Sequence, residues 1–310
     1  MAAWTASDIP DQTGRVAVVT GANGGVGYPV ARELARRGAH VVLACRSERR
    51  GTEACARLRA EVPAAGAEFR PLDLAELDSV RAFARDFAGD RLDLLVNNAG
   101  VMALPYRETA DGFEMQIGVN HFGHFALTGL LLPKLLATPR ARVVSLSSIA
   151  HLAARVDPAG LGSGHRRDHR RFRAYARSKT ANLLFVHELA RRLAAAGSDV
   201  VAAAAHPGYA ATNLQLAGPR MEGRRLAERL NALGHRAFAQ SADRGALPVL
   251  FAATAPGVHP DAFIGTRLQG WRGGPARSWR ARWTLDDTAA AGLWERSVKL
   301  TGVAYEALAP

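Results

Sequence analysis

Short apolar runs that alternate with helical stretches constrain the fold of this chain more than any other feature. From residue 15 to about residue 255, nearly apolar runs of about five residues alternate with longer segments in which apolar positions recur at helical spacing. Nearly continuous apolar runs are typical of parallel strands that are covered on both faces. The alternation predicts an α/β fold in a single domain, namely a doubly wound parallel sheet with helices on both faces and right-handed crossovers.

The same pattern predicts where each element lies. Strands are expected at 15–20, 40–45, 68–72, 92–96, 142–146 and 200–204, with a last short strand near 262–265. Helices are expected near 26–37, 48–61, 76–88, 113–136, 174–196 and 241–254. The segments 155–173 and 209–240 interrupt the alternation, and we interpret them as loops or as a lid over a site.

Composition is compatible with one large core and with a cytoplasmic protein. The 310 residues are 48% hydrophobic, and no stretch approaches the roughly 20 consecutive apolar residues of a membrane span. Residues 1–14 carry no basic-then-apolar signal pattern, so neither secretion nor a membrane anchor is expected. Cys45 and Cys55 lack metal-ligand spacing, which favours a reduced, cytoplasmic protein.

A net charge of +12 prompts the hypothesis of a nucleic-acid or membrane partner. Only three of the 40 basic residues are lysines, and most of the arginines are spread along helical stretches, as on solvated faces. Denser runs lie at 165–173, 220–229 and 267–282, without the aromatic and glycine pattern of an RNA-binding module. We therefore expect no nucleic-acid partner. The last two runs are interpreted as solvated lid faces, with recognition of an acidic substrate as the alternative.

A glycine-rich turn follows the first predicted strand. Gly21, Gly25 and Gly27 form a G-x-x-x-G-x-G pattern between that strand and an amphipathic helix. Glycines allow positive φ and remove Cβ atoms that would block a pyrophosphate, and a helix N-terminus offers free N–H groups to an anion. A glycine pattern alone also fits a tight turn without a ligand. Its place in the first strand–turn–helix unit predicts a Rossmann-like, dinucleotide-binding sheet.

The end of the second strand bears on which dinucleotide binds. An NAD-selective site usually places a carboxylate there for the ribose 2′-hydroxyl, whereas an arginine accommodates a 2′-phosphate. Here Cys45 stands about where the acid would be, and Arg46 follows it. The absent carboxylate predicts NADP, with NAD as the less expected cofactor.

Tyr175 and Lys179 lie four residues apart, on one face of a predicted helix. A free tyrosine, with a pKa of about 10, is too weak an acid for efficient proton transfer at neutral pH. We expect the Lys179 ammonium to lower the pKa of Tyr175, and the hydroxyl of Ser148 or Ser147 to hold a substrate oxygen. The pair by itself also fits an exposed helical pair.

Two further motifs indicate that this pair lies in a ligand-binding crevice. The Asn-Asn-Ala-Gly turn at 97–100 follows one predicted strand, and Ser147 and Ser148 follow the next. In open α/β sheets, ligands bind at the carboxyl ends of such strands. Both motifs are therefore expected to face the same site as Tyr175 and Lys179.

Together these motifs resemble the short-chain dehydrogenase/reductase family. The resemblance rests on 20–27, Asp73, 97–100, Asn120, Ser148, Tyr175, Lys179 and 207–208, in the family's order, and extends from about residue 15 to at least residue 254. The stretches 119–125, 147–151 and 178–182 resemble the retinol dehydrogenase-like branch. Light-dependent protochlorophyllide reductases and the WW-domain-containing oxidoreductases are similar in the same stretches.

The resemblance implies an oxidoreductase that transfers a hydride between NADP(H) and a carbonyl or alcohol. It implies that Tyr175 exchanges a proton with the substrate oxygen, that Ser148 polarises this oxygen, and that Lys179 binds the nicotinamide ribose. The Asn120 carbonyl would hold a water that links Lys179 to solvent. Cofactor contacts are implied for Gly21, Asn23, Gly25, Val26, Gly27, Arg46, Asp73, Leu74, Asn98, Ala99, Gly100, Tyr175, Lys179, Pro207, Gly208 and Thr212.

The resemblance also suggests how the chain is organised. Residues 1–14 would be a lead, 15–285 the Rossmann-type domain with a lid segment near 209–240, and 286–310 a C-terminal helix and tail. The 27 positions from Ser148 to Tyr175 form a longer connection than in many relatives. A retinoid substrate, a membrane location and light-driven chemistry are not expected, so the substrate class stays a small apolar carbonyl or alcohol.

Alternative functions can be distinguished from this one by specific sequence features. A cofactor-sensing regulatory or scaffold protein of the same fold is the main rival, and loss of the Tyr175–Lys179 pair would favour it. A sugar-nucleotide epimerase or dehydratase would need a different glycine spacing and a larger C-terminal domain. His121, His124, His151 and His206 lack a ligand spacing, so structural roles are expected for them and no metal.

Overall fold

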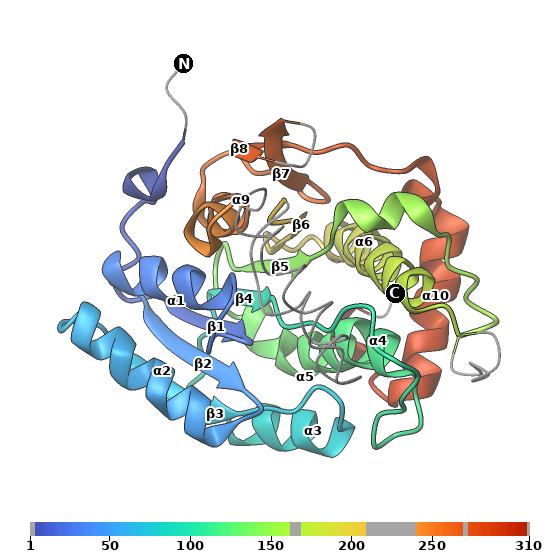
Figure 1. The fold of residues 1–310 in the computed structure, drawn as a ribbon, viewed down its shortest axis with the longest axis horizontal. Helices are drawn as coiled ribbons and strands as arrows, with labels where there is room; N and C mark the ends of the chain where they lie inside the picture. Colours follow the sequence, from blue (N-terminus) through green and yellow to red (C-terminus); the bar gives the residue numbers. More distant parts are fainter. Residues whose placement is uncertain (1–3, 162–168, 209–239, 269–271, 309–310) are drawn as a thin grey trace, which may run out of the picture.

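The computed structural model describes residues 4–161, 169–208, 240–268 and 272–308, which build one twisted sheet between two layers of helices (Figure 1). The strands follow the order β3-β2-β1-β4-β5-β6-β7-β8. They are β1 (Val16–Thr20), β2 (His40–Cys45), β3 (Ala67–Pro71), β4 (Leu94–Asn97), β5 (Arg142–Leu146), β6 (Val201–Ala205), β7 (Phe263–Leu268) and β8 (Arg272–Arg277). All neighbours are parallel except β7 and β8.

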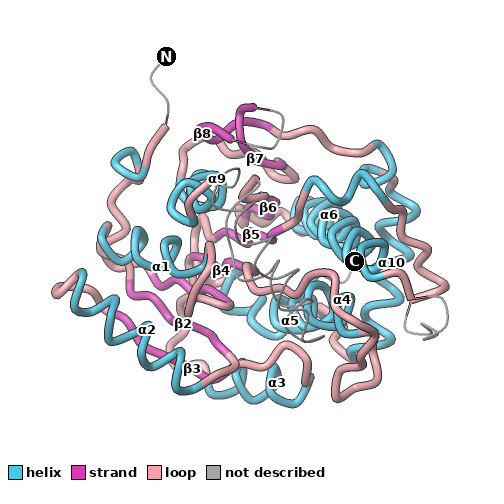
Figure 2. The backbone as a smooth tube through the Cα atoms, viewed as in Figure 1, coloured by secondary structure: helices cyan, strands magenta, loops and turns pink. Residues whose placement is uncertain are grey.

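Helices cover both faces of the sheet, as the cyan and magenta tubes of Figure 2 show. The longer ones are α1 (Gly27–Arg36), α2 (Glu48–Glu61), α3 (Leu77–Asp86), α5 (Gly123–Leu136), α6 (Arg171–Ala195), α9 (Ala242–Thr254) and α10 (Asp287–Thr301). Short segments are η1 (Ala6–Asp8), α4 (Met115–Ile117), η2 (Gly118–Phe122), η3 (Ile149–Ala153), η6 (Arg282–Leu285) and η7 (Glu306–Leu308). The doubly wound sheet predicted from the apolar runs is confirmed.

Strand β1 shows why its sequence is almost continuously apolar. Val18 belongs to the core beneath α3, α5, α6 and α10, whereas Ala17 and Val19 belong to the core beneath α1, α2 and α9. Successive side chains of a strand point to opposite faces, so a strand covered on both sides must be apolar at every position. Val18 pairs with Val42 on one side and Leu95 on the other.

The strand order reverses direction between β1 and β4, and this determines where a ligand can lie. The chain runs outward from β1 through β2 to β3 and then returns to place β4 on the other side of β1. The carboxyl ends of β1 and β4, at Thr20 and Asn97, flank the crevice that this reversal opens.

The long helix predicted near 113–136 is broken in the structure. A short α4 passes through one π-helical turn, η2, into α5. Extra residues in such a turn change the direction of the helix and are frequent at functional sites. Asn120 lies in the middle of this turn, so the irregularity coincides with a residue that the motifs had singled out.

The C-terminal part differs most from the sequence prediction. Strand β8 is antiparallel to β7 at the edge of the sheet and was not predicted, because Gly273, Gly274 and Pro275 give it no apolar alternation. Proline is tolerated at such an edge. The interpretation of 267–282 as a solvated face is wrong at Arg280, whose side chain is 9% exposed. Among the helices in the described part of the chain, none combines the length and the hydropathy of a membrane span.

Candidate active site

The glycine turn joins β1 to α1 by a close approach of backbone to backbone. Gly21 and Gly25 have φ values of 65° and 53°, which side chains disfavour. A Cβ on Gly27 would lie 2.4 Å from the Asn98 Nδ2 atom and 2.6 Å from the Gly21 carbonyl oxygen. Val26, the N-cap of α1, makes no side-chain capping bond. The Tyr28 N–H donates to the Gly24 carbonyl at 3.3 Å and Pro29 has no N–H, so the Gly27 N–H is the group at the start of the helix that is left for an anion.

Thr20, the last residue of β1, ties this turn to the Asn-Asn-Ala-Gly motif. Its hydroxyl oxygen accepts hydrogen bonds from the backbone N–H groups of Asn98 and Ala99, both at 2.9 Å. The Asn98 side chain donates to the Thr20 carbonyl at 2.6 Å. The two motifs that the sequence placed after different strands are therefore one rigid unit at the end of the sheet.

The end of β2 presents an arginine and no free acid. Burial raises the pKa of the Cys45 thiol to about 11, so it is neutral at this position. The Arg46 side chain is 66% exposed, and its Nε atom lies 3.8 Å from the Asp73 carboxylate. Asp73 also accepts a hydrogen bond from the Ala75 N–H at 2.9 Å. Leu74 is buried against the start of α5, with its carbonyl facing Gly123.

Tyr175, Lys179 and Ser148 meet beside the carboxyl end of β5. Tyr175 and Lys179 lie one turn apart in α6, and the Lys179 ammonium is 5.7 Å from the centre of the Tyr175 ring. The Ser148 side chain hydrogen-bonds to Tyr175. The Ser147 hydroxyl instead donates to the Lys179 carbonyl at 2.8 Å, inside the protein. The Ser148 side chain therefore contacts Tyr175, whereas the Ser147 hydroxyl is bonded to the backbone of α6.

Burial controls the protonation of both groups in α6. It raises the pKa of Tyr175 to about 12, against the opposing hydrogen bond from Ser148, and it lowers the pKa of Lys179 to about 8. This differs from the expectation that Lys179 lowers the pKa of Tyr175, because the cost of burying the phenolate is larger. The Lys179 ammonium is directed to the Leu146 carbonyl, to which it donates at 3.1 Å. Tyr175 is thus a neutral phenol, ready to donate.

Asn120 is held by both ends of its side chain. Its Oδ1 accepts from the Val101 N–H at 2.8 Å, and its Nδ2 donates to the Val101 carbonyl and to the Ser178 hydroxyl, each at 2.9 Å. A Cβ on Gly100 would lie 3.0 Å from Asn120 Oδ1 and 3.6 Å from Lys179 Nζ. Asn120 and Gly100 therefore lie next to Lys179.

His124 connects Asn120 to the end of β1. Its Nδ1 is 3.1 Å from the Asn120 carbonyl oxygen, and its Nε2 is 2.9 Å from the Thr20 hydroxyl. The Asn120 carbonyl can only accept, so the His124 proton is on Nδ1 and Nε2 accepts from the Thr20 hydroxyl. Burial lowers the pKa of His124 to about 3, which keeps the ring neutral. The sequence predicted only a structural role for this histidine, although it lies one helical turn after Asn120.

Other predicted residues lie apart from this group. The His121 ring hydrogen-bonds to the Ser297 hydroxyl of α10, while His151 and His206 lie behind the ends of β5 and β6. Within 4–161, 169–208, 240–268 and 272–308, no cluster of His, Cys, Asp or Glu side chains could hold a metal ion. Pro207 and Gly208 lie just after β6, separated from it by His206, and the Gln240 amide donates to the Pro207 carbonyl at 2.6 Å. Thr212 and nearly all of the lid segment 209–240 lie outside the described residues.

The site defines a class of protein before any comparison. A glycine turn at a helix N-terminus, beside a tyrosine, a lysine and a serine at the ends of parallel strands, is the arrangement of a single-domain, dinucleotide-dependent oxidoreductase. The residues present fit the pyrophosphate of such a cofactor, because Gly27 leaves no room for a side chain and α1 has an uncapped N-terminus.

The comparisons with known proteins agree. The sequence pattern of the short chain dehydrogenase family matches residues 15–222, and the chain belongs to that family, in its retinol dehydrogenase-like branch. It is 41% identical to retinol dehydrogenase 12 of Mus musculus over 298 residues, which cover 94% of this chain and 88% of that protein. It is 42% identical to polyprenol dehydrogenase of Mus musculus over 302 residues, or 95% and 86% of the two chains. The chain is therefore an NAD(P)-dependent oxidoreductase that acts on CH–OH or C=O groups.

Solved structures share the fold. A crystal structure of an uncharacterised protein from Mycobacterium paratuberculosis is 43% identical, with a TM-score of 0.81 over 98% of this chain and 99% of that one. A protein from Beutenbergia cavernae, described as an NAD(P)-dependent gluconate 5-dehydrogenase and solved with bound NADP, is 27% identical, with a TM-score of 0.61 over 80% and 93% of the chains. The prediction of the family from its motifs is confirmed.

Proposed function

We propose that this protein is an NADP(H)-dependent carbonyl reductase or alcohol dehydrogenase whose proton relay consists of Tyr175, Lys179, Ser148 and Asn120. The observation that carries the proposal is the buried phenol of Tyr175, hydrogen-bonded to Ser148 and one turn from the Lys179 ammonium. A protonated tyrosine in this place can give its proton to a carbonyl oxygen that becomes an alkoxide.

When bound, the nicotinamide supplies or accepts the hydride at the substrate carbon. In the reductive direction, Tyr175 donates its phenolic proton to the substrate oxygen as the C=O bond becomes C–OH. The Ser148 hydroxyl donates a second hydrogen bond to the same oxygen and stabilises its developing charge. The Lys179 ammonium stabilises the resulting phenolate, and a proton returns to Tyr175 along the path past Lys179 and the Asn120 carbonyl. In the oxidative direction the same groups act in reverse.

The preference for NADP rests on the charge at the end of β2. Arg46 extends into solvent, and its carboxylate partner in the described part of the chain, Asp73, lies 3.8 Å away. The neutral Cys45 offers nothing to a ribose hydroxyl. An exposed guanidinium of this kind suits a 2′-phosphate, because it can donate two parallel hydrogen bonds to it. Structural relatives solved with NADP or NADPH support the same preference.

Apolar side chains beside Tyr175 support an apolar substrate. Phe172 is 55% exposed, with its ring centre 6.3 Å from that of Tyr175. Ile149 and Leu152 are each 40% exposed and lie on η3, which packs against the helix α6 that carries Tyr175, and Met102 packs against the cluster that contains Tyr175. Exposed large apolar groups around a reactive residue are typical of a binding surface for an apolar molecule. Retinol and polyprenol, which name two relatives, are alcohols with long apolar chains.

Substitution of Tyr175 tests the acid–base assignment. In Tyr175→Phe, kcat for an apolar aldehyde, followed by NADPH absorbance, should fall at least about 100-fold, since general acid catalysis contributes a factor of that order. The Kd for NADPH should stay within about twofold of wild type. The matched control is Tyr305→Phe, which removes another buried phenol; it donates to the Phe125 carbonyl at 2.7 Å and lies in a different core cluster from Tyr175.

Two outcomes would contradict the proposal. If Tyr175→Phe keeps more than about a tenth of the wild-type kcat, the acid–base role is wrong. If wild type binds NADPH but reduces no member of a series of aldehydes and ketones, and oxidises none of the matching alcohols, the regulatory or scaffold alternative gains support. The cytoplasmic location stays a prediction from cysteine usage.

A further inference from the structure

The segment 278–284, which follows β8, contacts two buried histidines behind the candidate active site. The Ser278 hydroxyl is 2.7 Å from His206 Nε2, and the Ala281 N–H donates to His151 Nε2 at 3.2 Å. Both rings are almost fully buried. This segment lies beyond residues 15–222, where the family pattern matches.

His151 links the backbone of Ala281 to the backbone of Ser148 by two hydrogen bonds. A backbone N–H can only donate, so Nε2 of His151 must be its acceptor, and the ring proton is on Nδ1. That nitrogen donates to the Ser148 carbonyl at 2.7 Å. Ser148 is the residue whose hydroxyl bonds to Tyr175, so the imidazole fixes the backbone on which this hydroxyl is carried.

His206 links Ser278 in the same way to Gly208, in the turn after β6. The Gly208 N–H donates to His206 Nδ1 at 3.1 Å, so the ring proton is on Nε2 and points to the Ser278 hydroxyl. A Cβ on Gly265 of β7 would lie 1.9 Å from His206 Nε2, so the ring uses space that only a glycine leaves. Phe263 lies between the two histidines, with ring centres 5.4 Å from His151 and 5.1 Å from His206.

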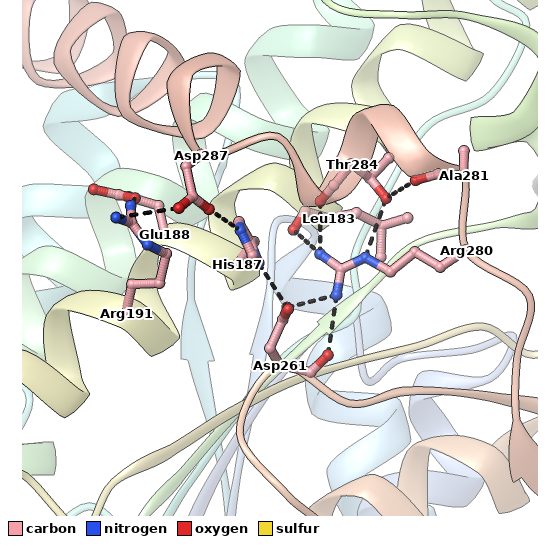
Figure 3. Close-up of polar contacts among 9 residues, drawn as sticks. All are labelled: Leu183, His187, Glu188, Arg191, Asp261, Arg280, Ala281, Thr284 and Asp287. Atoms are coloured by element: carbon pink, nitrogen blue, oxygen red, sulfur yellow. Dashed lines mark hydrogen bonds and ion pairs between the residues drawn. The ribbon is translucent and has the colours of Figure 1, made fainter.

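Arg280 anchors the segment to the helix that carries Tyr175 (Figure 3). Its guanidinium donates to the Leu183 carbonyl of α6 at 3.0 Å, to the Thr284 carbonyl at 2.9 Å and to the Asp261 carbonyl at 3.0 Å. It also pairs with the Asp261 carboxylate. His187 of α6 bridges the same carboxylate, at 2.7 Å, to that of Asp287 in α10, at 2.8 Å. Arg280 thus fixes the segment to α6, and Asp261 and His187 connect this contact to Asp287 of α10.

We propose that the segment 278–284 positions the candidate active site, with His151 holding Ser148 and His206 holding the Pro207–Gly208 turn. His151 and His206 are positioning residues, since neither reaches Tyr175 or Lys179. The proposal rests on the proposed function for its kinetic consequences, but its structural consequence stands without it. A histidine that donates at one nitrogen and accepts at the other couples two backbones, and a small displacement of Ser148 is enough to slow proton transfer.

A pair of serine substitutions tests the coupling. Ser278→Ala removes the partner of His206, and Ser297→Ala removes the partner of His121, another buried histidine–serine bond at 2.8 Å, on α10. In Ser278→Ala the unfolding equilibrium constant should rise about fivefold, the effect of one hydrogen bond. The Ser297 hydroxyl also donates to the Leu293 carbonyl, so Ser297→Ala should lose at least as much stability. Only Ser278→Ala should change the kinetics, with kcat about three- to tenfold lower and the Kd for NADPH nearly unchanged. Ser278→Thr keeps the hydroxyl and should restore kcat.

His151 gives a second test. His151→Phe keeps the ring volume and loses both hydrogen bonds, so kcat should fall about 10- to 100-fold. His151→Asn places an amide N–H near the position of Nδ1 and should recover part of the loss. If the two serine variants have the same kcat, or His151→Asn is no better than His151→Phe, the positioning role is wrong.

Hydrogen exchange separates this proposal from the proposed function. The Gly208 amide should exchange at least about fivefold faster in Ser278→Ala than in Ser297→Ala, because its acceptor on His206 is loosened. Faster exchange in a protein that turns over no substrate would support the coupling and refute the enzymatic role. Unchanged exchange and unchanged kcat in an active enzyme would refute the coupling alone.

Discussion

At the scale of single residues, burial determines which protonation states the site offers. Tyr175 and Lys179 are each inside the protein, so the phenol keeps its proton and the ammonium loses its proton more readily than in water. Arg46 is the opposite case, because its charge lies in solvent and its stability contribution is small. An exposed, weakly paired guanidinium is therefore free to serve a ligand.

Replacement of Arg46 should change the choice of cofactor. In Arg46→Asp, the Kd for NADPH should rise about 10- to 100-fold, since charge-assisted hydrogen bonds contribute about 1.5–3 kcal/mol. The Kd for NADH should stay the same or fall. Fluorescence titration with both cofactors measures the ratio. Arg49→Ala, which removes a neighbouring, 75% exposed arginine of α2, is the control and should leave the ratio unchanged. Equal binding of NADPH and NADH by wild type would contradict the NADP assignment.

At the scale of elements, irregular backbone positions the reactive groups. The π-helical turn η2 brings Asn120 to face Val101, and the turn between β1 and α1 folds back on Asn98. With a regular helix in place of η2, or a wider turn after β1, the backbone would take another direction and these contacts would be lost. The segment 278–284 has no regular structure at its start, yet it contacts His151 after β5 and His206 after β6.

A methyl group in the glycine turn should damage both the fold and cofactor binding. In Gly27→Ala, the new Cβ would meet the Gly21 carbonyl oxygen at 2.6 Å, which should lower the free energy of unfolding by about 1–3 kcal/mol. The displaced helix N-terminus should raise the Kd for NADPH at least about tenfold. Gly24→Ala, where no atom lies within 4 Å of the added Cβ, should unfold at the wild-type temperature. Equal unfolding temperatures for the two variants would show that the turn is not tightly packed.

At the scale of the whole molecule, buried histidines should set the acid limit of stability. Burial lowers the pKa of His121 and of His124 to about 3, and of His206 to about 4. The unfolded chain binds protons at these rings from about pH 6.5 downward, while the folded protein does not, so stability falls as the pH falls. His187 offsets part of this loss. Its pKa is raised by Asp261, so its stabilising contribution grows as the pH falls from 7, is complete below about pH 6.5, and is lost as the pH rises.

Urea unfolding at pH 7 and pH 5 measures this effect. Each of the three rings should cost about 2 kcal/mol of unfolding free energy at pH 5. His121→Gln keeps an N–H near Ser297 but cannot be protonated, so its stability should fall about 2 kcal/mol less over the same interval. A free energy of unfolding that is the same at both pH values would show that these rings are protonated in the folded protein.

Much of the site followed from the order of motifs along the chain. Tyr175 and Lys179 are one helical turn apart in any helix, and the turns at 21–27 and 97–100 follow strands whose ends must lie on one edge of a parallel sheet. The roles of Ser148 and Ser147 could not be separated this way. Adjacent residues at a strand end differ only in which way each side chain points, and Ser147 points to the Lys179 carbonyl.

The sequence by itself determined the fold class and the family and predicted the reactive residues, because these depend on local periodicity and on spacings within single elements. Tertiary structure alone decided the raised pKa of Tyr175, which depends on burial by distant elements. It alone revealed that Arg280, in a run of arginines that looked solvated, lies inside the protein next to Asp261. Contacts such as those of His151 and His206 with 278–284 join residues more than 70 positions apart. No local pattern records them, because they exist only once the chain has packed.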